Sequence, residues 1–374
     1  MARRRIRTIP GLLIALSLAA TGLGIGGVAM TTGSATASPA PDAAAAHAEH
    51  VAKAGYAMPG MPGMPLSTKA SGDDPDGDGY IMANPPVTGV APSTYDPPHA
   101  YFHEFQAQCA PTKTAPDDPI VYPGQAGASH DHTFMGNTGT NANSTTASLE
   151  SGNTACLAVG DKSAYWMPSL FKGTQKILPI GTQTIYYKSA INDYTSVRPF
   201  PKGLRFVVGS PMQSQDEFQH LKGTVEGWEC GTSYHNWNFP ATCPNTPDTQ
   251  LNIRLQSPSC WDGIHLDTPD HKSHMAYTVA SGNNQNVCPA DHPVALPMIE
   301  FKMAWPVNGD MSQIHLSSGA GYSFHYDFFN AWDARTLAAM VTHCVNGGLQ
   351  CDSRGYDQSQ PGKGAVLNQN YQLP

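Results

Sequence analysis

The stretch 257-SPSCWDGIHLDTPDHKSHMAY-277 is the segment around which we expect the fold to be organised. It holds three histidines beside three aspartates, namely His265, His271 and His274 with Asp262, Asp267 and Asp270. Imidazole and carboxylate groups are costly to bury unless they are paired or bind a metal. The stretch therefore predicts an acid/base or metal site, and the rest of the chain is interpreted as a scaffold that brings further histidines to it.

Two other motifs present polar side chains at strand spacing. Residues i and i+2 of a strand point to the same face, so an extended SHDHTF segment directs His130 and His132 to one side. The H-x-H pattern is a common way to offer two imidazoles to one metal. In GYSFHYDF, His325 and Asp327 share one face of a strand, and the alternating aromatic residues Phe324, Tyr326 and Phe328 share the other.

These three segments define the candidate site. The candidate catalytic residues are His130, His271, His274, Asp270, His325 and Asp327, and the candidate metal ligands are His130, His132, His274 and His325. A divalent metal ion is the candidate cofactor, with Asp270 as a general base or as a group that orients an imidazole. A metal-free version uses a histidine base with Tyr277 as acid or Arg205 as charge neutraliser. The competing interpretation is that the histidines are structural and bond to backbone carbonyls.

Composition predicts the fold class. The chain has 36 glycines and 32 prolines, and only 13% of its residues are charged, which is typical of short strands joined by turns. Strands are expected at 118–124, 183–188, 204–209, 251–255 and 299–305. One helix is expected from Asp333, its cap, to Val345, before Gly347-Gly348. We predict a mainly β protein: a single large β-sandwich or jelly-roll-like domain with long loops and one C-terminal helix.

Eight cysteines, an even number, favour disulfides in an exported chain. No C-x-x-C occurs, which argues against a zinc-thiolate knuckle. Eight cysteines allow about 105 pairings. Pairing in sequence order is the working hypothesis, which gives Cys109–Cys156, Cys230–Cys243, Cys260–Cys288 and Cys344–Cys351.

The first quarter of the chain is not expected to belong to the folded domain. Residues 1–37 have a basic start, an apolar run and an Ala-Thr-Ala cleavage site, as a secretory signal peptide does. Residues 38–98 are interpreted as a flexible linker rich in Ala, Met, Pro and Gly, and residues 99–374 as one β-rich domain. Within the linker, His47, His50 and the Met-Pro-Gly repeat are a candidate copper site, and Asp74-Pro-Asp-Gly-Asp-Gly resembles the start of a calcium loop without its closing Glu.

Charge and missing motifs exclude several functions. Without residues 1–37 the chain has 17 basic and 29 acidic residues, a net charge of −12, which argues against nucleic acid or an anionic membrane as partner. No G-x-S-x-G elbow and no Walker or Rossmann glycine pattern is present. A soluble, secreted, extracellular protein, expected to be a monomer, fits this charge. Six tryptophans scattered among polar loops give mild support for stacking on sugars.

Six motifs in a fixed order carry a resemblance to a known family. They are DPIVYPGQAGASHDHTFMGN, SAYWMPSL, PFPKGLRFVVG, CWDGIHLDTPDHKSHMAY, CPADHPVALP and GYSFHYDFFNAWD. Together they resemble a secreted family called domain of unknown function nineteen ninety-six, over about Tyr101 to Cys351. The resemblance implies a cell-wall or polysaccharide context, because family members often stand beside carbohydrate-binding modules. It implies no particular reaction.

The sequence therefore supports two main hypotheses about function. The first is a secreted enzyme acting on polysaccharide, a hydrolase or lyase with a His/Asp-rich, metal-assisted centre. The second is a non-catalytic protein that binds extracellular glycan or the cell wall and uses its histidines structurally. The sequence leaves open whether the protein is an enzyme. A third class, an exported metal-binding protein, would use the Met and His residues of the linker.

Overall fold

Two large sheets dominate the structure, a computed structural model that describes residues 71–282, 285–360, 364–367 and 371. The seven-stranded sheet has the order β11 (Ser233–Asn236), β10 (Thr224–Cys230), β12 (Leu251–Gln256), β19 (Met298–Trp305), β8 (Gln183–Lys188), β2 (Glu104–Cys109) and β22 (Gln350–Cys351). The five-stranded sheet has the order β3 (Pro111–Ala115), β4 (His132–Gly136), β5 (Ala164–Pro168), β21 (His325–Phe329) and β9 (Arg205–Gly209). The mainly β fold class is confirmed.

The remaining short strands form small sheets. Two are two-stranded: β1 (Ile81–Met82) with β14 (His265–Asp267), and β16 (Val279–Ala280) with β17 (Asn286–Val287). Two are three-stranded, in the orders β15 (Met275–Ala276), β13 (Cys260–Trp261), β18 (Val294–Ala295) and β20 (Ile314–Leu316), β6 (Leu170–Lys172), β7 (Gln175–Ile177). The helices are α2 (Thr146–Ser151), η1 (Tyr194–Ser196), α3 (Gln215–His220), η2 (Gly321–Ser323), α4 (Ala334–Met340) and η3 (Val341–Val345). In the described residues no helix is long and apolar enough to cross a membrane.

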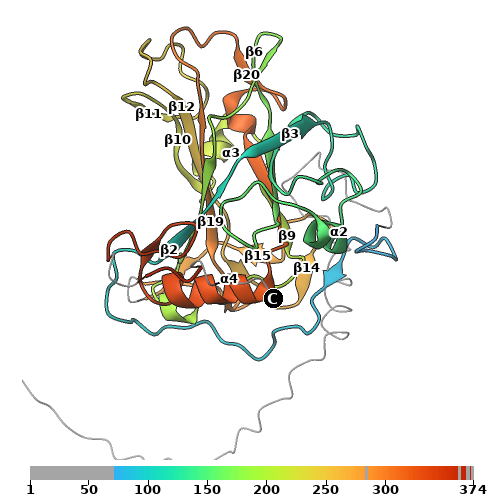
Figure 1. Cartoon of the computed structure of the whole chain (residues 1–374), viewed down its shortest axis with the longest axis vertical. Helices are drawn as coiled ribbons and strands as arrows, with labels where there is room; N and C mark the ends of the chain where they lie inside the picture. The colour runs from blue at the N-terminus through green and yellow to red at the C-terminus, as the bar shows by residue number, and fades with distance from the viewer. Residues whose placement is uncertain (1–70, 283–284, 361–363, 368–370, 372–374) are drawn as a thin grey trace, which may run out of the picture. The chain divides into compact units, whose positions relative to one another are not determined.

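Aromatic rings join the two large sheets face to face. Phe301 of β19 stacks on Tyr326 of β21 with ring centroids 3.8 Å apart, and Tyr165 of β5 lies 6.0 Å from Phe301. These rings are fully buried, and burying a side chain of this size contributes about 1.5–3 kcal/mol. In Figure 1, β10, β12 and β2 lie on the left and β3 and β9 on the right. The sheets therefore form a sandwich with an aromatic core, as the alternation in β19 and β21 predicts.

The predicted strands and helix can now be compared with the structure. Four of the five expected strands are present as β8, β9, β12 and β19. Residues 118–124 form turns instead, because the Asp118 carboxylate accepts hydrogen bonds from the backbone N–H groups of Ile120 and Val121, both 2.9 Å. The expected helix is confirmed: Asp333 caps α4 by accepting from the Thr336 N–H at 2.8 Å, and η3 continues it as one π-helical turn to Val345.

All four disulfides pair in sequence order, as predicted. They are Cys109–Cys156, Cys230–Cys243, Cys260–Cys288 and Cys344–Cys351, and the described part of the chain holds no free cysteine. The bond from Cys260 anchors the start of the 257–277 stretch, and the last bond joins η3 to β22. Such bonds stabilise small sheets that bury little surface, in general by about 2–4 kcal/mol each.

The boundary of the linker needs correction. Residues 71–98 were assigned to the linker, but part of this segment packs on the domain: β1 pairs with β14, and the Asp73 carboxylate forms a 2.7 Å ion pair with Arg205. Residues 1–70, with the predicted signal peptide and copper-binding residues, lie outside the described residues. The Asp74 carboxylate accepts from the N–H groups of Gly77 and Gly79, as in a turn, and ligand atoms of Asp74, Asp76 and Asp78 lie within 4.8 Å of one another.

A buried polar network lies at one end of the sandwich. Asp161 accepts a 2.7 Å hydrogen bond from the Tyr165 hydroxyl, which contacts the Tyr187 hydroxyl, and the Trp332 indole N–H donates to Tyr187 at 2.9 Å. Burial raises the pKa of Asp161 to about 7, against the opposing hydrogen bonds from Tyr165 and Ser163. The folded state therefore keeps a proton on Asp161 at pH values where the unfolded chain has released it.

This network predicts a specific dependence of stability on pH. Between pH 4 and 7 the unfolded chain binds fewer protons at Asp161 than the folded chain, so the free energy of unfolding of the wild type falls, by up to about 4 kcal/mol from this group. Asp161→Asn does not titrate and keeps an acceptor for Tyr165. We expect the wild type to lose stability relative to Asp161→Asn as the pH rises from 4 to 7, in thermal melts. An exposed control, Asp76→Asn, should follow the wild type, and parallel curves for all three proteins would contradict the prediction.

Candidate metal centre

Three histidines converge on the outer face of the five-stranded sheet. His132 begins β4, His325 begins β21, and His130 lies in the loop before β4. The centroid of the His130 ring lies 4.3 Å from that of the His132 ring and 5.0 Å from that of the His325 ring. The centroids of the His132 and His325 rings are 5.7 Å apart. One nitrogen of each ring lies within 4.8 Å of the others. Segments about 200 residues apart in the sequence thus supply one group of potential ligands.

The hydrogen bonds of two of these rings determine which nitrogen faces the group. The Nδ1 atoms of His132 and His325 lie 2.9 Å from the backbone carbonyls of Asp117 and Ser323. A carbonyl only accepts, so each Nδ1 carries the proton and each Nε2 keeps its lone pair. The Nε2 atoms of His130 and His132 are buried and have no hydrogen-bond partner within the described chain. Two buried imidazole nitrogens without hydrogen-bond partners are costly, and a metal would satisfy them.

Burial also keeps these imidazoles neutral. It lowers the pKa of His130 to about 4, although the nearby Asp131 charge opposes the shift. The pKa values of His132 and His325 lie well below the usual value, first because of burial and second because of the neighbouring His130. Metal ligation requires a neutral imidazole, so all three rings are in the binding-competent form at pH 7.

Two buried carboxyl groups lie beside the histidines. Asp327 projects from the same strand face as His325, and ligand atoms of Asp118, His132 and Asp327 lie within 4.8 Å of one another. Neither carboxylate oxygen of Asp327 has a hydrogen-bond partner among the described residues. Burial raises the pKa of Asp327 well above its usual value, the Asp118 charge raises it further, and Lys272 opposes the shift. Burial raises the pKa of Asp118 to about 6.

The 257–277 stretch lies along the edge strand β9, next to this group. The backbone of His271 accepts from the Val207 N–H at 3.0 Å, the Lys272 ammonium donates to the Gly209 carbonyl at 2.6 Å, and His274 Nε2 donates to the Arg205 carbonyl, at 2.8 Å. These bonds cover the free edge of the five-stranded sheet, which would otherwise be open to pairing with another chain. The stretch therefore covers and supports the histidine group.

Most polar side chains of the stretch are used by its own turns. The Asp270 carboxylate accepts from Thr268, Ser273 and the Lys272 N–H, and His265 Nδ1 lies 2.6 Å from Asp262. His274 contacts the Thr268 hydroxyl through Nδ1 and the Arg205 carbonyl through Nε2, so both of its nitrogens are occupied. Within the described chain His274 joins no group of potential metal ligands. The structure thus separates His274 and Asp270 from the other candidates.

His271 differs from its neighbours. It adopts a left-handed backbone conformation with φ of 56°, which is uncommon for a residue with a side chain. Its Nδ1 contacts the Asp267 carboxylate at 3.0 Å, while its buried Nε2 has no partner among the described residues. The pKa of His271 is raised: burial lowers it, but the charge and hydrogen bond of Asp267 outweigh burial. His271 is therefore the member of the stretch that remains available to the site.

Several sequence expectations about this site do not hold. Arg205 was a candidate charge neutraliser in the metal-free version, but its side chain is 4% exposed and pairs with Asp73. The Tyr277 hydroxyl donates to the Gln256 carbonyl, and burial raises its pKa, so it is a poor general acid. Five of the six tryptophans are buried in the core, because their indoles fill the spaces between and behind the sheets; these are Trp166, Trp228, Trp261, Trp305 and Trp332. Asp118 was not predicted as a site residue, because the sequence pattern indicates only that it begins the strand expected at 118–124.

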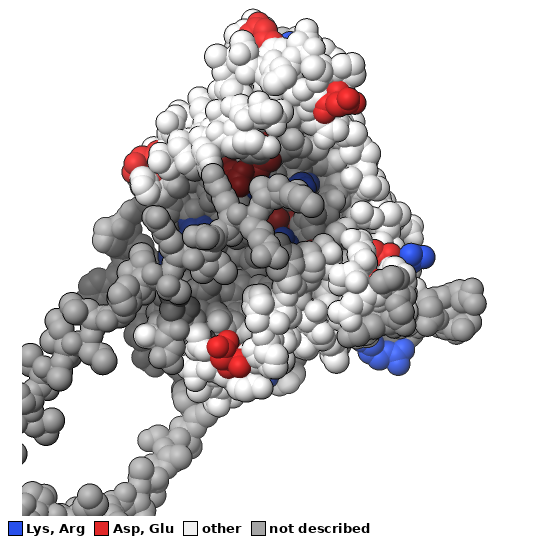
Figure 2. Space-filling view, turned by 90° about the vertical axis from the view of Figure 1, so that its left-hand side faces the viewer, with Lys and Arg blue, Asp and Glu red and all other residues white. Residues whose placement is uncertain are grey.

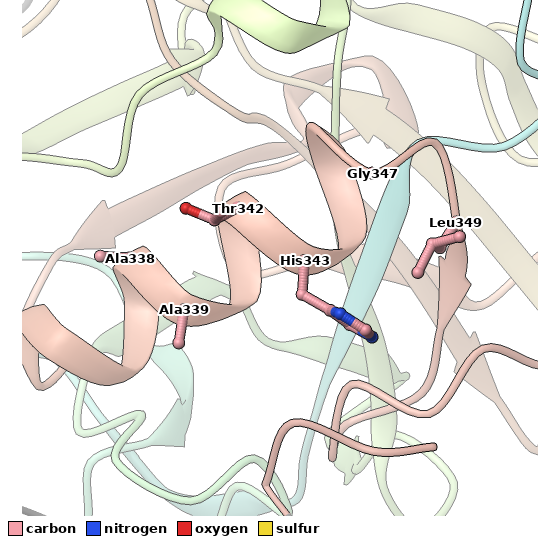
Figure 3. A pocket seen from close by; sticks show the side chains of 6 residues that line it. All are labelled: Ala338, Ala339, Thr342, His343, Gly347 and Leu349. Atoms are coloured by element: carbon pink, nitrogen blue, oxygen red, sulfur yellow. The ribbon is translucent and has the colours of Figure 1, made fainter. Parts of the chain in front are cut away.

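The two described pockets lie away from the histidines. One of about 600 Å³ is lined by Ala338, Ala339, Thr342, His343, Gly347 and Leu349, and in Figure 3 the His343 ring extends beside η3 toward Leu349. His343 also neighbours Cys344 and Cys351, but a disulfide binds those sulfurs. The second, of about 310 Å³, includes Lys176, whose ammonium donates to Asp131 at 2.8 Å. Asp131 is the residue between His130 and His132 in the sequence. Lys176 therefore links this pocket to the histidine segment, although no histidine of the centre lines the pocket.

The comparisons define a family and no activity. A family model described as "Domain of unknown function (DUF1996)" matches residues 118–332, which is more than half of the chain and contains all three converging histidines, Asp118 and Asp327. The chain therefore belongs to this family, as the sequence motifs predict. Neither the comparison with curated proteins nor the comparison with solved structures finds a match.

Proposed function

We propose that the protein is a secreted, metal-dependent enzyme that acts on extracellular polysaccharide. One observation carries the proposal: one ring nitrogen from each of three neutral imidazoles lies within 4.8 Å of the others, and the buried Nε2 atoms of His130 and His132 have no partner in the described chain. Three histidines that leave a position open are a known ligand set of catalytic zinc. A metal held there would polarise a substrate oxygen or lower the pKa of a bound water.

The residues around the centre would have different roles in catalysis. His130, His132 and His325 hold the metal, and the carbonyls of Asp117 and Ser323 fix the orientation of two of these rings. Asp327, with both oxygens buried and unpartnered in the described chain, is the group placed to take or return a proton. The Lys272 ammonium opposes the rise in the pKa of Asp327. His130 is the least buried of the three ligands, so we place the open side of the centre there.

The proposed location and substrate class come from the sequence. The basic and apolar start of the chain, the four disulfides and the acidic net charge suit an exported protein. Polysaccharide is the substrate class because the family resemblance implies a cell-wall context. A hydrolase and a lyase remain equally compatible with a metal beside a carboxyl group.

A non-catalytic glycan-binding protein is the second candidate, and one observation favours it. His132 and His325 are 0% and 3% exposed, and neither described pocket is lined by a histidine of the centre. A structural metal site is closed in this way, whereas a catalytic site needs room for substrate. In that case the metal would stabilise the outer face of the sheet and take no part in a reaction.

Metal content and turnover distinguish these candidates. Purified wild type should carry about one tightly bound metal ion per chain, by elemental analysis. His130→Ala should lose at least about tenfold in metal affinity, because one of three protein ligands is gone. The exposed His220→Ala on α3 is the matched control and should bind as the wild type does. Equal metal content in His130→Ala and wild type would contradict the centre.

The same samples test catalysis. Cleavage of a panel of polysaccharides should disappear when the metal is removed with a chelator and should return when the metal is added back. Loss of metal without any change in cleavage would contradict the metal-dependent enzyme. A protein that binds metal and cleaves none of the polysaccharides would support the second candidate.

A further inference from the structure

The seven-stranded sheet has a polar outer face that the histidine centre does not use. Alternate residues of β2, β8, β12 and β19 point into the aromatic core, and the residues between them point away from it. Along the strand register, Gln256, Glu300, Tyr186 and Gln106 lie side by side on four adjacent strands. Lys188 and Glu104 pair in the next row. Four adjacent strands cover about 14 Å, enough for a short oligosaccharide.

This face is hollowed. Figure 2 shows the molecule from the side of the seven-stranded sheet, and acidic and basic side chains are visible at the floor of a depression. The exposures agree with residues at the bottom of a hollow: Glu300 is 3% exposed and Glu104 is 7% exposed, although both point away from the core. An ordinary solvated sheet face exposes its carboxylates, whereas Glu300 and Glu104 are nearly covered here and Lys302 of the same face is exposed.

The side chains in the hollow hold one another in place. The Lys188 ammonium lies 3.4 Å from the Glu104 carboxylate and 3.3 Å from the Glu300 carboxylate, and Gln256 donates to Glu300 at 2.5 Å. Beside them, Arg254 pairs with Glu229 at 3.0 Å. Arg254 also pairs with Glu226 at 3.3 Å, so the array is preorganised and two basic groups pair with four carboxylates.

Tyr186 adds an aromatic surface to this array. Its side chain is partly exposed, and the Lys188 ammonium lies 4.3 Å from its ring centroid. Burial and the nearby charges of Glu104 and Glu300 raise the pKa of Tyr186, so its hydroxyl keeps the proton that it can donate. An aromatic ring bordered by carboxylate, amide and ammonium groups offers stacking together with hydrogen bonds.

We propose that this hollow is a binding site for a neutral oligosaccharide. Sugar hydroxyls donate and accept hydrogen bonds, which matches the mixed carboxylate, amide and ammonium groups of the floor. The excess of carboxylates argues against an anionic ligand, and the ion pairs that these carboxylates already form with Lys188 and Arg254 argue against a strongly cationic one. Tyr186 packs against the face of a sugar ring, and Glu300, Glu104 and Gln106 bind its hydroxyls.

This site is separate from the metal centre. The hollow lies on the outer face of the seven-stranded sheet, and the three histidines lie on the outer face of the five-stranded sheet, with the aromatic core between them. A sugar bound in the hollow therefore does not reach the histidines. The proposal shares only the polysaccharide with the proposed function, and each can fail without the other.

Binding to insoluble polysaccharides tests the site. The probes are microcrystalline cellulose, chitin and insoluble xylan, with polygalacturonate as an anionic comparison, in pull-down assays with the full chain. We expect wild type to bind at least one neutral polymer, and both Tyr186→Ala and Glu300→Gln to weaken that binding by about tenfold or more, since each removes contacts to the sugar. Tyr95→Ala, an exposed tyrosine outside the sheet, is the matched control and should bind as the wild type does.

Folding and the metal centre are controlled in the same series. Thermal melts report folding, and Gln106→Ala, which removes an amide without breaking an ion pair, replaces any variant that fails to fold. His130→Ala should retain full polysaccharide binding. The proposal is overturned if the wild type binds none of the neutral polymers, if it binds only polygalacturonate, or if the folded hollow variants bind as tightly as Tyr95→Ala.

Discussion

Saturating metal is expected to raise the free energy of unfolding of the metal-stripped wild-type protein by about 4 kcal/mol at a thousandfold excess over the dissociation constant. The reason is that the ligand set forms only on folding: His130 and His132 come from β4 and the loop before it, while His325 comes from β21. The unfolded chain cannot bring these segments together without a large loss of entropy. Metal therefore binds the folded state and shifts the unfolding equilibrium toward it.

The measurement compares denaturant unfolding with and without Zn²⁺ in three proteins. In His325→Ala the metal-induced gain should fall close to zero, because two histidines remain and the buried Nδ1 bond to Ser323 is lost with the ring. The metal-free stability of this variant is not the test, since removing a buried ring lowers it anyway. His220→Ala should show the full gain. A gain of the same size in His325→Ala and wild type would place the stabilising metal elsewhere in the chain.

The sequence predicted the fold correctly where the alternation of apolar and polar residues matches the side of a strand that is buried. In β19 the alternation of Ile299, Phe301 and Met303 with polar residues matches the side that faces the core, and the sandwich follows from such strands. The disulfides are close in sequence, with separations of 7 to 47 residues, so pairing in order was correct. The turn at 118–124 was missed because Val and Ile favour strands, whereas the Asp118 side chain binds the backbone and prevents extension.

The site was accessible in part. Strand spacing correctly placed His325 and Asp327 on one face, and the H-x-H motif marked two of the three histidines that meet. The sequence could not show that both ring nitrogens of His274 are hydrogen-bonded, one to the Thr268 hydroxyl and one to the Arg205 carbonyl, because the second partner depends on where β9 lies. The polar face of the seven-stranded sheet was also visible only after pairing, since Glu104 and Glu300 are about 200 residues apart.

Arg205 explains why the folded part begins before residue 99. Its guanidinium lies 3.7 Å from the centroid of the Phe329 ring and is almost completely buried, so it needs an anion beside it. Asp73 supplies that charge at 2.7 Å and also accepts from the N–H and hydroxyl of Thr146 at the start of α2. A segment that is polar and rich in glycine and proline is thus held by this buried ion pair together with the pairing of β1 and β14, and no periodic sequence pattern predicts either contact.

Asp73→Ala is therefore expected to destabilise the protein by about 3 kcal/mol, since it leaves a buried guanidinium without its partner. Asp76→Ala, an exposed acid three residues away, should change stability by less than about 0.5 kcal/mol in the same denaturant titration. The double variant Asp73→Ala/Arg205→Met removes the unpaired charge while keeping an unbranched side chain on Phe329, and it should recover a large part of the loss. If Asp73→Ala is as stable as Asp76→Ala, the Asp73–Arg205 ion pair does not stabilise the folded domain, and the pairing of β1 with β14 alone holds this segment.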